Sequence, residues 1–215
     1  MRETLVVLDA MGVIYASQDD VAELLIPYAR SFGCTLSNRE IEDLYLECSL
    51  GKFSSLALWQ SLGAGGDLHA LEEDYLNGHR LSEGLADFLG AMDAHNLQVA
   101  CLSNDVAEWA LSLRRRFGLN QRLTHWTISG NVGARKPDPA IYKHLLSATG
   151  REPEDCIFVD DRVRNIDIAR DMGFKTVLFT RNPDSNKRRP LASSFHELQE
   201  CVLGLAPPRA TASGK

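Results

Sequence analysis

Residues 5–15, LVVLDAMGVIY, are the stretch that decides the fold. Residues 5–8 are apolar and β-favouring with no polar alternation, which is typical of a parallel strand buried on both faces. Burial of each of these side chains contributes roughly 1.5–3 kcal/mol. Asp9 follows directly, at the carboxyl end of the strand, where open α/β sheets bind their ligands. Gly12 then permits a tight turn around Asp9. Taken alone, Asp9 is better explained as the polar end of a strand, so any function depends on the rest of the chain.

The composition predicts one core with one insertion. The 215 residues contain no repeat, and the formal net charge of −6 gives no electrostatic reason to expect nucleic acid as a partner. No run approaches the ~18 apolar residues of a membrane-spanning helix, and no secretory signal is recognisable. We therefore expect a cytoplasmic protein that acts on a small molecule, with no membrane partner. The 5 scattered cysteines lack zinc-site spacing and are expected to be reduced thiols.

Residues 17–81 show helical periodicity throughout and predict an all-helical insertion after the first strand. Apolar residues recur at three- and four-residue steps from Val21 to Phe32. Ser37 and Glu40 form a capping box that begins a second helix. Two more helices are expected over residues 56–62 and 68–76, and the acidic run 72–74 within the last is expected to face solvent.

After residue 82 strands alternate with helices, which predicts a doubly wound parallel α/β sheet covered by helices on both faces. The expected core comprises residues 1–16 and 82–206, and the Pro-, Ala-, Ser- and Gly-containing tail 207–215 is predicted to be disordered. Further strands are expected over residues 97–102, 127–129, 156–159 and 175–180, and helices over residues 85–92, 109–117, 140–149, 165–172 and 195–205.

Polar side chains follow three of the predicted strands. Asp9 follows the first, Ser103 and Asn104 follow the strand over residues 97–102, and Asp160 and Asp161 follow the strand over residues 156–159. Because the carboxyl ends of parallel strands meet at one edge of a sheet, one shared polar site is more plausible than three unrelated strand ends.

In this order the residues resemble the haloacid dehalogenase superfamily. Asp9 matches the nucleophilic aspartate of that family, and Ser103 matches the Ser/Thr of its second motif. Lys136, within ARKPDPAIY, matches the lysine of the third motif. Asp160 and Asp161, within FVDDRVRNIDIARDMG, match the acidic fourth motif. The helical insertion resembles the family's cap, and LGKFSSLALWQSLG is similar to caps of the sugar-phosphate and epoxide-hydrolase-associated phosphatase branch.

The resemblance implies a Mg²⁺-dependent phosphatase that hydrolyses a small phosphorylated metabolite through an aspartyl-phosphate on Asp9. It implies that Mg²⁺ is bound by the Asp9 carboxylate, the Met11 backbone carbonyl and the side chain of Asp160 or Asp161. Lys136 would act with Asp9 in catalysis by placing a positive charge on the phosphoryl oxygens.

The same resemblance assigns substrate binding to three residues. Ser103 and Asn104 would donate hydrogen bonds to the phosphoryl group. Gly12 would let the backbone approach it closely. Neither the identity of the substrate nor the oligomeric state follows from the sequence. Arg30, Arg39, Tyr45 and Trp59 are the side chains of the insertion considered for substrate selection.

Met11 departs from the family pattern, since most phosphatases of the family have a second aspartate at that position. That aspartate protonates the leaving alkoxide and later activates water, and a thioether can do neither. General acid–base catalysis typically supplies about 10²–10⁴-fold in rate, so its loss costs roughly 3–5.5 kcal/mol of barrier stabilisation. His79 and Tyr15 are the replacement acids considered from the sequence.

Three interpretations stay open. The first is a phosphatase whose substrate has a good leaving group, or whose proton comes from another residue. The second is a 2-haloacid dehalogenase-type hydrolase, because DAMG resembles that branch and a halide leaves without a proton. Asp160 and Asp161 weigh against it, since they would repel a carboxylate substrate. The third is a non-catalytic homologue that binds phosphate ligands without hydrolysing them.

Overall fold

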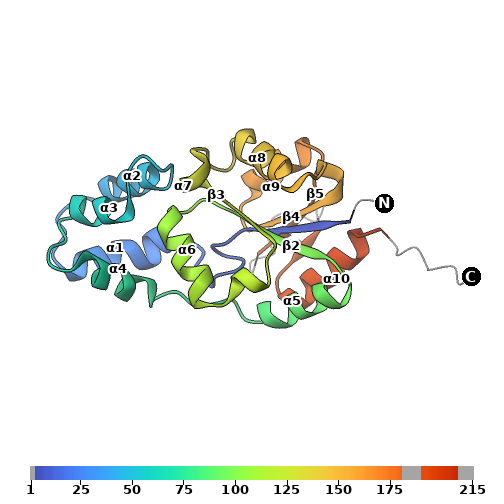
Figure 1. Ribbon diagram of the computed structural model, residues 1–215, viewed down its shortest axis with the longest axis horizontal. Coiled ribbons are helices and arrows are strands. Elements are labelled where there is room, and N and C mark those ends of the chain that lie inside the picture. The colour runs from blue at the N-terminus through green and yellow to red at the C-terminus, as the bar shows by residue number, and fades with distance from the viewer. Residues whose placement is uncertain (1–2, 181–189, 208–215) are drawn as a thin grey trace, which may run out of the picture.

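The computed structural model describes residues 3–180 and 190–207. Within them, six parallel strands form one sheet in the order β3-β2-β1-β4-β5-β6, with helices on both faces (Figure 1). The predicted doubly wound α/β sheet is confirmed. The strands are β1 (Leu5–Leu8), β2 (Gln98–Ser103), β3 (His125–Ile128), β4 (Cys156–Asp160), β5 (Lys175–Phe179) and β6 (Leu191–Ala192).

The central strand β1 is buried on both faces, as its uniform apolar sequence predicts. Because side chains alternate across a strand, Val6 and Leu8 join the larger apolar cluster, and Leu5 and Val7 join the smaller one. Helices α8 and α9 supply the smaller cluster, and α5, α6 and α10 supply the larger one. The helices outside the insertion are α5 (Leu85–Ala94), α6 (Ala107–Arg116), η2 (Leu119–Gln121), α7 (Ser129–Val132), α8 (Pro139–Thr149), η3 (Pro153–Asp155), α9 (Val163–Asp171) and α10 (Phe195–Leu205).

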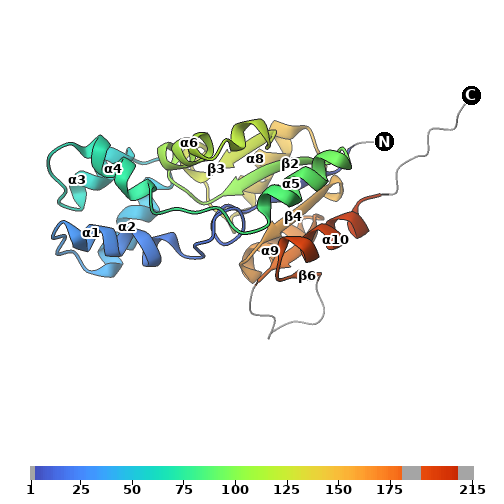
Figure 2. The same ribbon diagram turned by 90° about the horizontal axis from the view of Figure 1, so that it is seen from below.

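The helical insertion lies between β1 and α5 in the chain and beyond the carboxyl ends of the central strands (Figures 1 and 2). Its second helix begins with the predicted capping box. The backbone N–H of Glu40 donates to Ser37 Oγ, and the backbone N–H of Ser37 donates to Glu40 Oε2. The helices of the insertion are η1 (Val21–Leu25, a π-helical turn), α1 (Ile26–Ser31), α2 (Asn38–Cys48), α3 (Ser55–Ser61) and α4 (Leu68–Leu76).

The insertion packs firmly on the sheet-bearing part of the molecule through aromatic side chains. Trp59 of α3, Tyr75 of α4 and Trp109 of α6 belong to one continuous buried cluster. Glu72 of α4 accepts hydrogen bonds from the indole N–H groups of both tryptophans, at 2.9 Å and 2.8 Å. The prediction that the whole acidic run 72–74 faces solvent is therefore wrong for Glu72, because tertiary packing brings two indole donors to its carboxylate.

Two short elements escape the sequence-based prediction. Helix α7 begins at Ser129, where the sequence analysis placed the end of a strand, and β6 is only two residues long. Elements this short carry too few residues to show a period. The 5 cysteines are free thiols, as expected. Of the tail expected to be disordered, residues 208–215 lie outside the described residues. In the described part of the chain, no helix has the length and apolar character needed to cross a membrane.

Candidate active site

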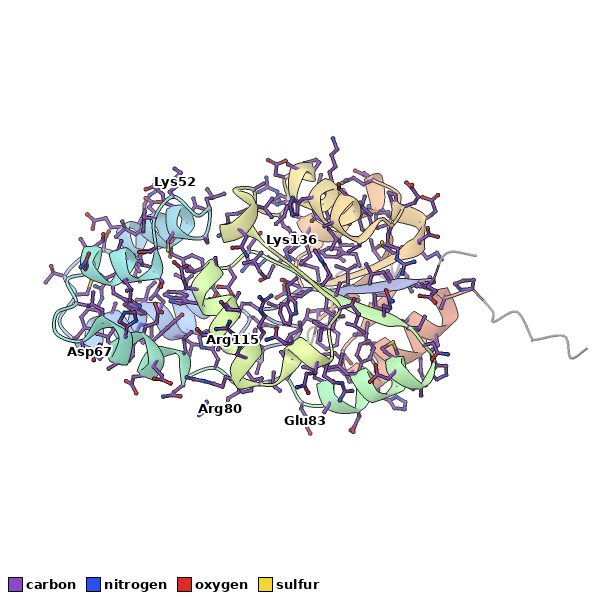
Figure 3. All side chains as sticks on the ribbon, in the orientation of Figure 1. Lys52, Asp67, Arg80, Glu83, Arg115 and Lys136 are labelled. Atoms are coloured by element: carbon purple, nitrogen blue, oxygen red, sulfur yellow. The ribbon has the colours of Figure 1, made fainter. Side chains whose placement is uncertain are left out.

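The polar strand ends meet at one edge of the sheet, as the sequence predicts. Strand β1 pairs with β2 on one side and with β4 on the other. Asp9, Ser103 and Asp160 therefore lie on neighbouring strands. Lys136 reaches the same place from the loop before α8, and Figure 3 shows it in the interior between the insertion and the sheet.

Lys136 joins two of the carboxylates. Its Nζ lies 2.6 Å from Asp9 Oδ1 and 2.7 Å from Asp160 Oδ2, and its side chain is almost completely buried. Burial by itself would lower the pKa of Lys136, but the Asp160 and Asp9 carboxylates raise it above its usual value. The ammonium group therefore stays charged at neutral pH.

Asn104 positions the lysine. Its Nδ2 donates to the Lys136 carbonyl at 2.9 Å, and its Oδ1 accepts from the Lys136 backbone N–H at 2.7 Å. The side chain that the sequence analysis assigned to the substrate thus uses its carbonyl oxygen and one amide hydrogen to hold the loop of the catalytic lysine candidate. It also lines the cavity described below.

Asp160 and Asp161 have different surroundings although they are neighbours in the chain. Asp160 accepts from Lys136 Nζ, from Asn165 Nδ2 at 3.0 Å, and from the Arg162 backbone N–H at 2.8 Å. Asp161 Oδ1 is buried and has no hydrogen-bond partner among the described residues. Asp161 is therefore the carboxylate with a buried oxygen available to a ligand.

The lack of a side chain at Gly12 leaves room for the Asp161 carboxylate as well as permitting the tight turn. Its φ is +79°, and a Cβ at this position would lie 2.5 Å from Asp161 Oδ2. Since only glycine adopts this conformation at no steric cost, the turn and the close approach both favour it. The sequence predicts the tight turn, whereas the contact with Asp161 comes from the tertiary structure.

Oxygen atoms of Asp9, Asp160 and Asp161 lie within 4.8 Å of one another, close enough to share one metal ion. The pKa of Asp9 is raised to about 8, mainly by burial; Lys136 opposes this shift, and the charges of Asp160 and Asp161 add to it. Burial and the Asp160 charge likewise raise the pKa of Asp161 to about 6. Three carboxylates share the charges of Lys136 and Arg162, so the negative charge is incompletely offset. Oxygen ligands with an unpaired Asp161 oxygen fit a hard divalent cation such as Mg²⁺.

A cavity of about 320 Å³ opens beside Asp9 and Lys136. Met11 and Asn104 line it from the sheet side, and Tyr45 of α2 lines it from the insertion. The volume suits a small metabolite. Of the side chains considered for substrate selection, Tyr45 borders this cavity, while Arg30, Arg39 and Trp59 are not among its lining residues.

Ser103 lies at the end of β2 but is not among the residues that line the cavity. Its hydroxyl oxygen is buried and without a hydrogen-bond partner among the described residues.

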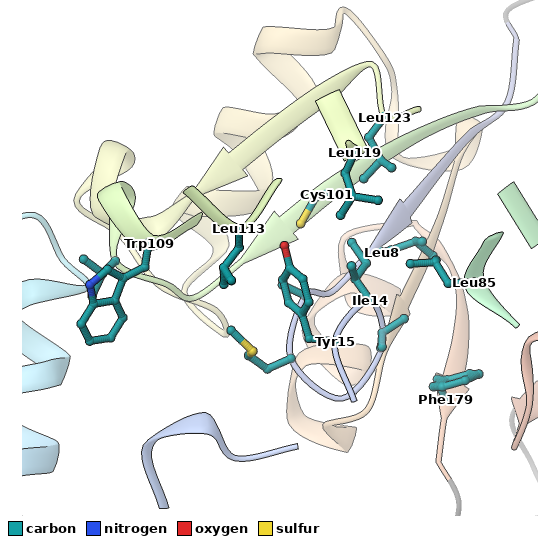
Figure 4. Packing of buried hydrophobic residues seen from close by; sticks show 14 of the residues in the cluster. Leu8, Ile14, Tyr15, Leu85, Cys101, Trp109, Leu113, Leu119, Leu123 and Phe179 are labelled. Carbon is teal, nitrogen blue, oxygen red and sulfur yellow. The ribbon is translucent and has the colours of Figure 1, made fainter. Parts of the chain in front are cut away.

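The two replacement acids considered from the sequence do not fit. Neither His79 nor Tyr15 is among the residues that line the cavity. Burial lowers the pKa of His79 to about 4, so it is neutral near pH 7. Tyr15 lies in the apolar core beside Leu113 and Cys101 (Figure 4), and burial raises its pKa above its usual value. His79 lacks the proton and Tyr15 lacks access to the cavity, so neither fits the role of the acid.

Several cavity residues are not singled out by the sequence, among them Asp20, Arg135 and Arg162. Arg135 precedes the matched lysine and Arg162 follows the acidic pair, so proximity to a motif was a signal for both. Asp20 begins the insertion and carried no signal beyond its charge.

An aspartate at the end of the central strand, a buried lysine, an acidic pair and a helical insertion together define a hydrolase of the haloacid dehalogenase type. Residues 4–173 match the family described as haloacid dehalogenase-like hydrolase, and the chain belongs to that family. One curated relative is flavin mononucleotide hydrolase 1 of Arabidopsis thaliana, which is 32% identical over 120 residues. This match covers 55% of the chain and 48% of the relative, so the chain spans about half the length of that protein.

Two solved structures share the fold. A haloacid dehalogenase family enzyme from Bacteroides thetaiotaomicron, in complex with magnesium and inorganic phosphate, superposes with a TM-score of 0.68 at 17% identity over 87% of this chain and 98% of that one. The L-2-haloacid dehalogenase of Xanthobacter autotrophicus with covalently bound chloropropionic acid also gives 0.68 at 17% identity, over 95% and 100% of the two chains. Several further curated relatives are named as phosphatases.

Proposed function

We propose that this protein is a Mg²⁺-dependent phosphatase that hydrolyses a small phosphorylated metabolite through an aspartyl-phosphate on Asp9. The observation that carries the proposal is the group of three carboxylates, Asp9, Asp160 and Asp161, around the buried ammonium group of Lys136 at the edge of a small cavity. A site with this charge excess favours a divalent cation, and a phosphate ester needs such a cation for attack by a carboxylate. The phosphatase relatives support the same conclusion.

Asp9 and Asp161 would hold the metal through their side chains, and Met11 would do so through its backbone carbonyl. Asp160 acts mainly by holding Lys136 and Asn165, because its oxygens already accept from both. When bound, Mg²⁺ supplies positive charge to the phosphoryl oxygens and orients them. The unpartnered oxygen of Asp161 and the close approach of Gly12 support this assignment.

Asp9 acts as the nucleophile. Its Oδ1 accepts from the Ala10 backbone N–H and from Lys136, each at 2.6 Å, which fixes the plane of the carboxylate. The same Lys136 charge stabilises the phosphoryl group during transfer. Ser103 Oγ at the end of β2 is buried and has no partner among the described residues, and it would donate a hydrogen bond to the phosphoryl group. Asn104 acts by positioning Lys136.

The helices of residues 17–81 act as the cap over a core of residues 1–16 and 82–206. They contribute Asp20 and Tyr45 to the cavity wall beside Asp9. A cap in this position excludes water from the reacting groups and selects the substrate by shape and charge. A cytoplasmic location is part of this proposal.

A 2-haloacid dehalogenase is the second candidate, since the DAMG turn lacks a second aspartate and a structure of that kind shares the fold. The acidic surroundings of Asp9 disfavour it. Asp160 and Asp161 would add negative charge opposite the carboxylate of a haloacid, whereas a phosphatase needs the Asp161 carboxylate to hold its metal.

Release of inorganic phosphate from sugar, acyl and alkyl phosphates, measured with Mg²⁺ and with EDTA, tests the proposal. We expect metal-dependent release that Asp9→Asn abolishes. Halide release from 2-haloacids that is insensitive to EDTA would establish the dehalogenase instead. Binding of phosphate compounds without turnover would show that the protein is a non-catalytic homologue.

A further inference from the structure

We infer that Asp20 is the general acid of this site and supplies the proton that Met11 cannot. The inference rests on the proposed phosphatase function and adds a residue to it. Asp20 lies nine positions beyond the usual place of the second aspartate, at the start of the insertion, and the tertiary structure returns it to the cavity that Asp9 and Met11 line.

Asp20 is buried at the cavity wall and has a carboxylate oxygen available to a ligand. The residue is 6% exposed, it borders the cavity, and its Oδ2 has no hydrogen-bond partner among the described residues. It precedes η1 but makes no capping hydrogen bond to that turn. A buried carboxyl oxygen without a partner costs free energy, so a functional reason for keeping it is expected.

The surroundings of Asp20 bring its pKa closer to neutral pH than that of an ordinary aspartate. The pKa of Asp20 is raised to about 6, mainly by burial and then by the Asp19 charge, while its own backbone N–H, Arg162 and Arg135 oppose the shift. A general acid works best when its pKa lies near the working pH. The titratable and charged groups that face it are Asp19 on its own segment, Tyr45 on α2, Tyr75 on α4, Asp105 after β2, Arg135 before Lys136, and Arg162 after β4.

The other acids at the cavity are less suitable. Tyr45 donates its hydroxyl proton to the Asn104 carbonyl, and burial raises its pKa well above the usual value. Asp19, Glu42 and Asp43 line the cavity but are exposed to solvent. Asp105 is buried and is not among the lining residues.

The reaction balances with Asp20 in this role. Asp9 attacks phosphorus while the bond from phosphorus to the ester oxygen breaks, and that oxygen takes the proton of Asp20. The Asp20 carboxylate then removes a proton from water, whose oxygen attacks the aspartyl-phosphate. The bond from phosphorus to Asp9 breaks, inorganic phosphate leaves, and both carboxyl groups return to their starting states.

The test is the dependence of kcat/KM on the leaving group, because an alkoxide needs a proton and a p-nitrophenolate does not. We would compare p-nitrophenyl, phenyl and ethyl phosphate in the unaltered protein, Asp20→Asn and Asp20→Ala. Loss of the acid is expected to reduce kcat/KM by about 10²–10⁴-fold on ethyl phosphate and by less than about tenfold on p-nitrophenyl phosphate. Glu23→Gln is the matched control: Glu23 lies three residues further on, is exposed and does not line the cavity.

A rescue and a pH profile separate catalysis from a structural effect. Adding Met11→Asp to Asp20→Asn should restore kcat/KM on ethyl phosphate by at least tenfold, because it returns a carboxyl group to the usual place. The fall in kcat/KM on ethyl phosphate as pH rises through about 6 should be present in the unaltered protein and in Glu23→Gln. It should be missing from Asp20→Asn.

The outcomes distinguish this inference from the proposed function. Equal losses on all three esters, or no rescue by Met11→Asp, would overturn the role of Asp20 while Asp9-dependent turnover upheld the phosphatase. Phosphate release that survives Asp9→Asn, or no release by the unaltered protein, would overturn both. A variant that fails to fold, as judged by its circular dichroism, is replaced by the other Asp20 variant in the same comparison.

Discussion

Gly12→Ala tests the assignment of Asp161 to the metal with a single methyl group. The added Cβ would stand 2.5 Å from Asp161 Oδ2 and 2.8 Å from its Cγ. The Gly12 backbone cannot yield easily, because its N–H donates to the carbonyls of Tyr15 and Ser17 within the turn. The Asp161 carboxylate must therefore move.

The size of the effect follows from these distances. Ordinary van der Waals contact begins at 3.4 Å, so the carboxylate must shift by about 1 Å. Metal–ligand distances in proteins tolerate about 0.2 Å. We therefore expect Mg²⁺ affinity to fall by about 10–100-fold, which is about 1.4–2.8 kcal/mol. Alanine at a positive φ adds about 1–2 kcal/mol of lost folding stability.

A matched control separates the two effects. Gly63 follows α3 at φ +86°, and a Cβ there would meet no atom within 4 Å. Gly63→Ala should therefore lose similar stability in urea unfolding and keep its Mg²⁺ affinity. Affinity is read by isothermal titration with Mg²⁺ and by the Mg²⁺ concentration that gives half-maximal phosphate release.

Unchanged Mg²⁺ affinity in a folded Gly12→Ala protein would refute the assignment of Asp161. Equal losses of affinity in Gly12→Ala and Gly63→Ala would show that general destabilisation, and not displacement of Asp161, weakens the metal.

Four further outcomes are expected. Asp9→Asn should abolish phosphate release while the urea midpoint does not fall, since the repulsion of Asp9 with Asp160 and Asp161 is removed. Retained release would exclude Asp9 as the nucleophile. Met11→Asp alone should raise kcat/KM on ethyl phosphate by less than about tenfold, because Asp20 already acts as the general acid. A gain of about 10²–10⁴-fold, the usual contribution of general acid catalysis, would contradict the role of Asp20. Glu72→Ala should lower the free energy of unfolding by about 2–4 kcal/mol, since two indole N–H groups lose their acceptor. Urea unfolding followed by tryptophan fluorescence measures this change, and a loss below about 1 kcal/mol would show that these hydrogen bonds contribute little. His79 has a pKa of about 4 in the folded protein against about 6.5 in the unfolded chain. Because the unfolded state binds the proton first, the free energy of unfolding falls by up to about 3 kcal/mol as pH drops from 6.5 to 4. His79→Gln should flatten this pH dependence in urea titrations, and an unchanged slope would show that another group titrates.

The sequence by itself determined the elements whose signals are local. Residues 5–8 form a buried strand because four consecutive apolar side chains can be satisfied only between two covered faces of a sheet. The helices Leu68–Leu76 and Phe195–Leu205 agree with the predicted ranges. Because consecutive strands of a doubly wound sheet end at one edge, the meeting of Asp9 with Asp160 was also predictable from the sequence.

Only the tertiary structure decided which of the acidic residues is fully hydrogen-bonded and which is available to a ligand. Asp160 and Asp161 have the same chemistry and adjacent numbers, yet one is saturated by Lys136 and Asn165 while the other keeps a free buried oxygen. Their difference arises because partners distant in the chain reach one carboxylate and not the other. Asp20 likewise enters the cavity through the packing of the insertion on the sheet. Burial, charge and access depend on contacts between distant segments, which a local sequence pattern does not contain.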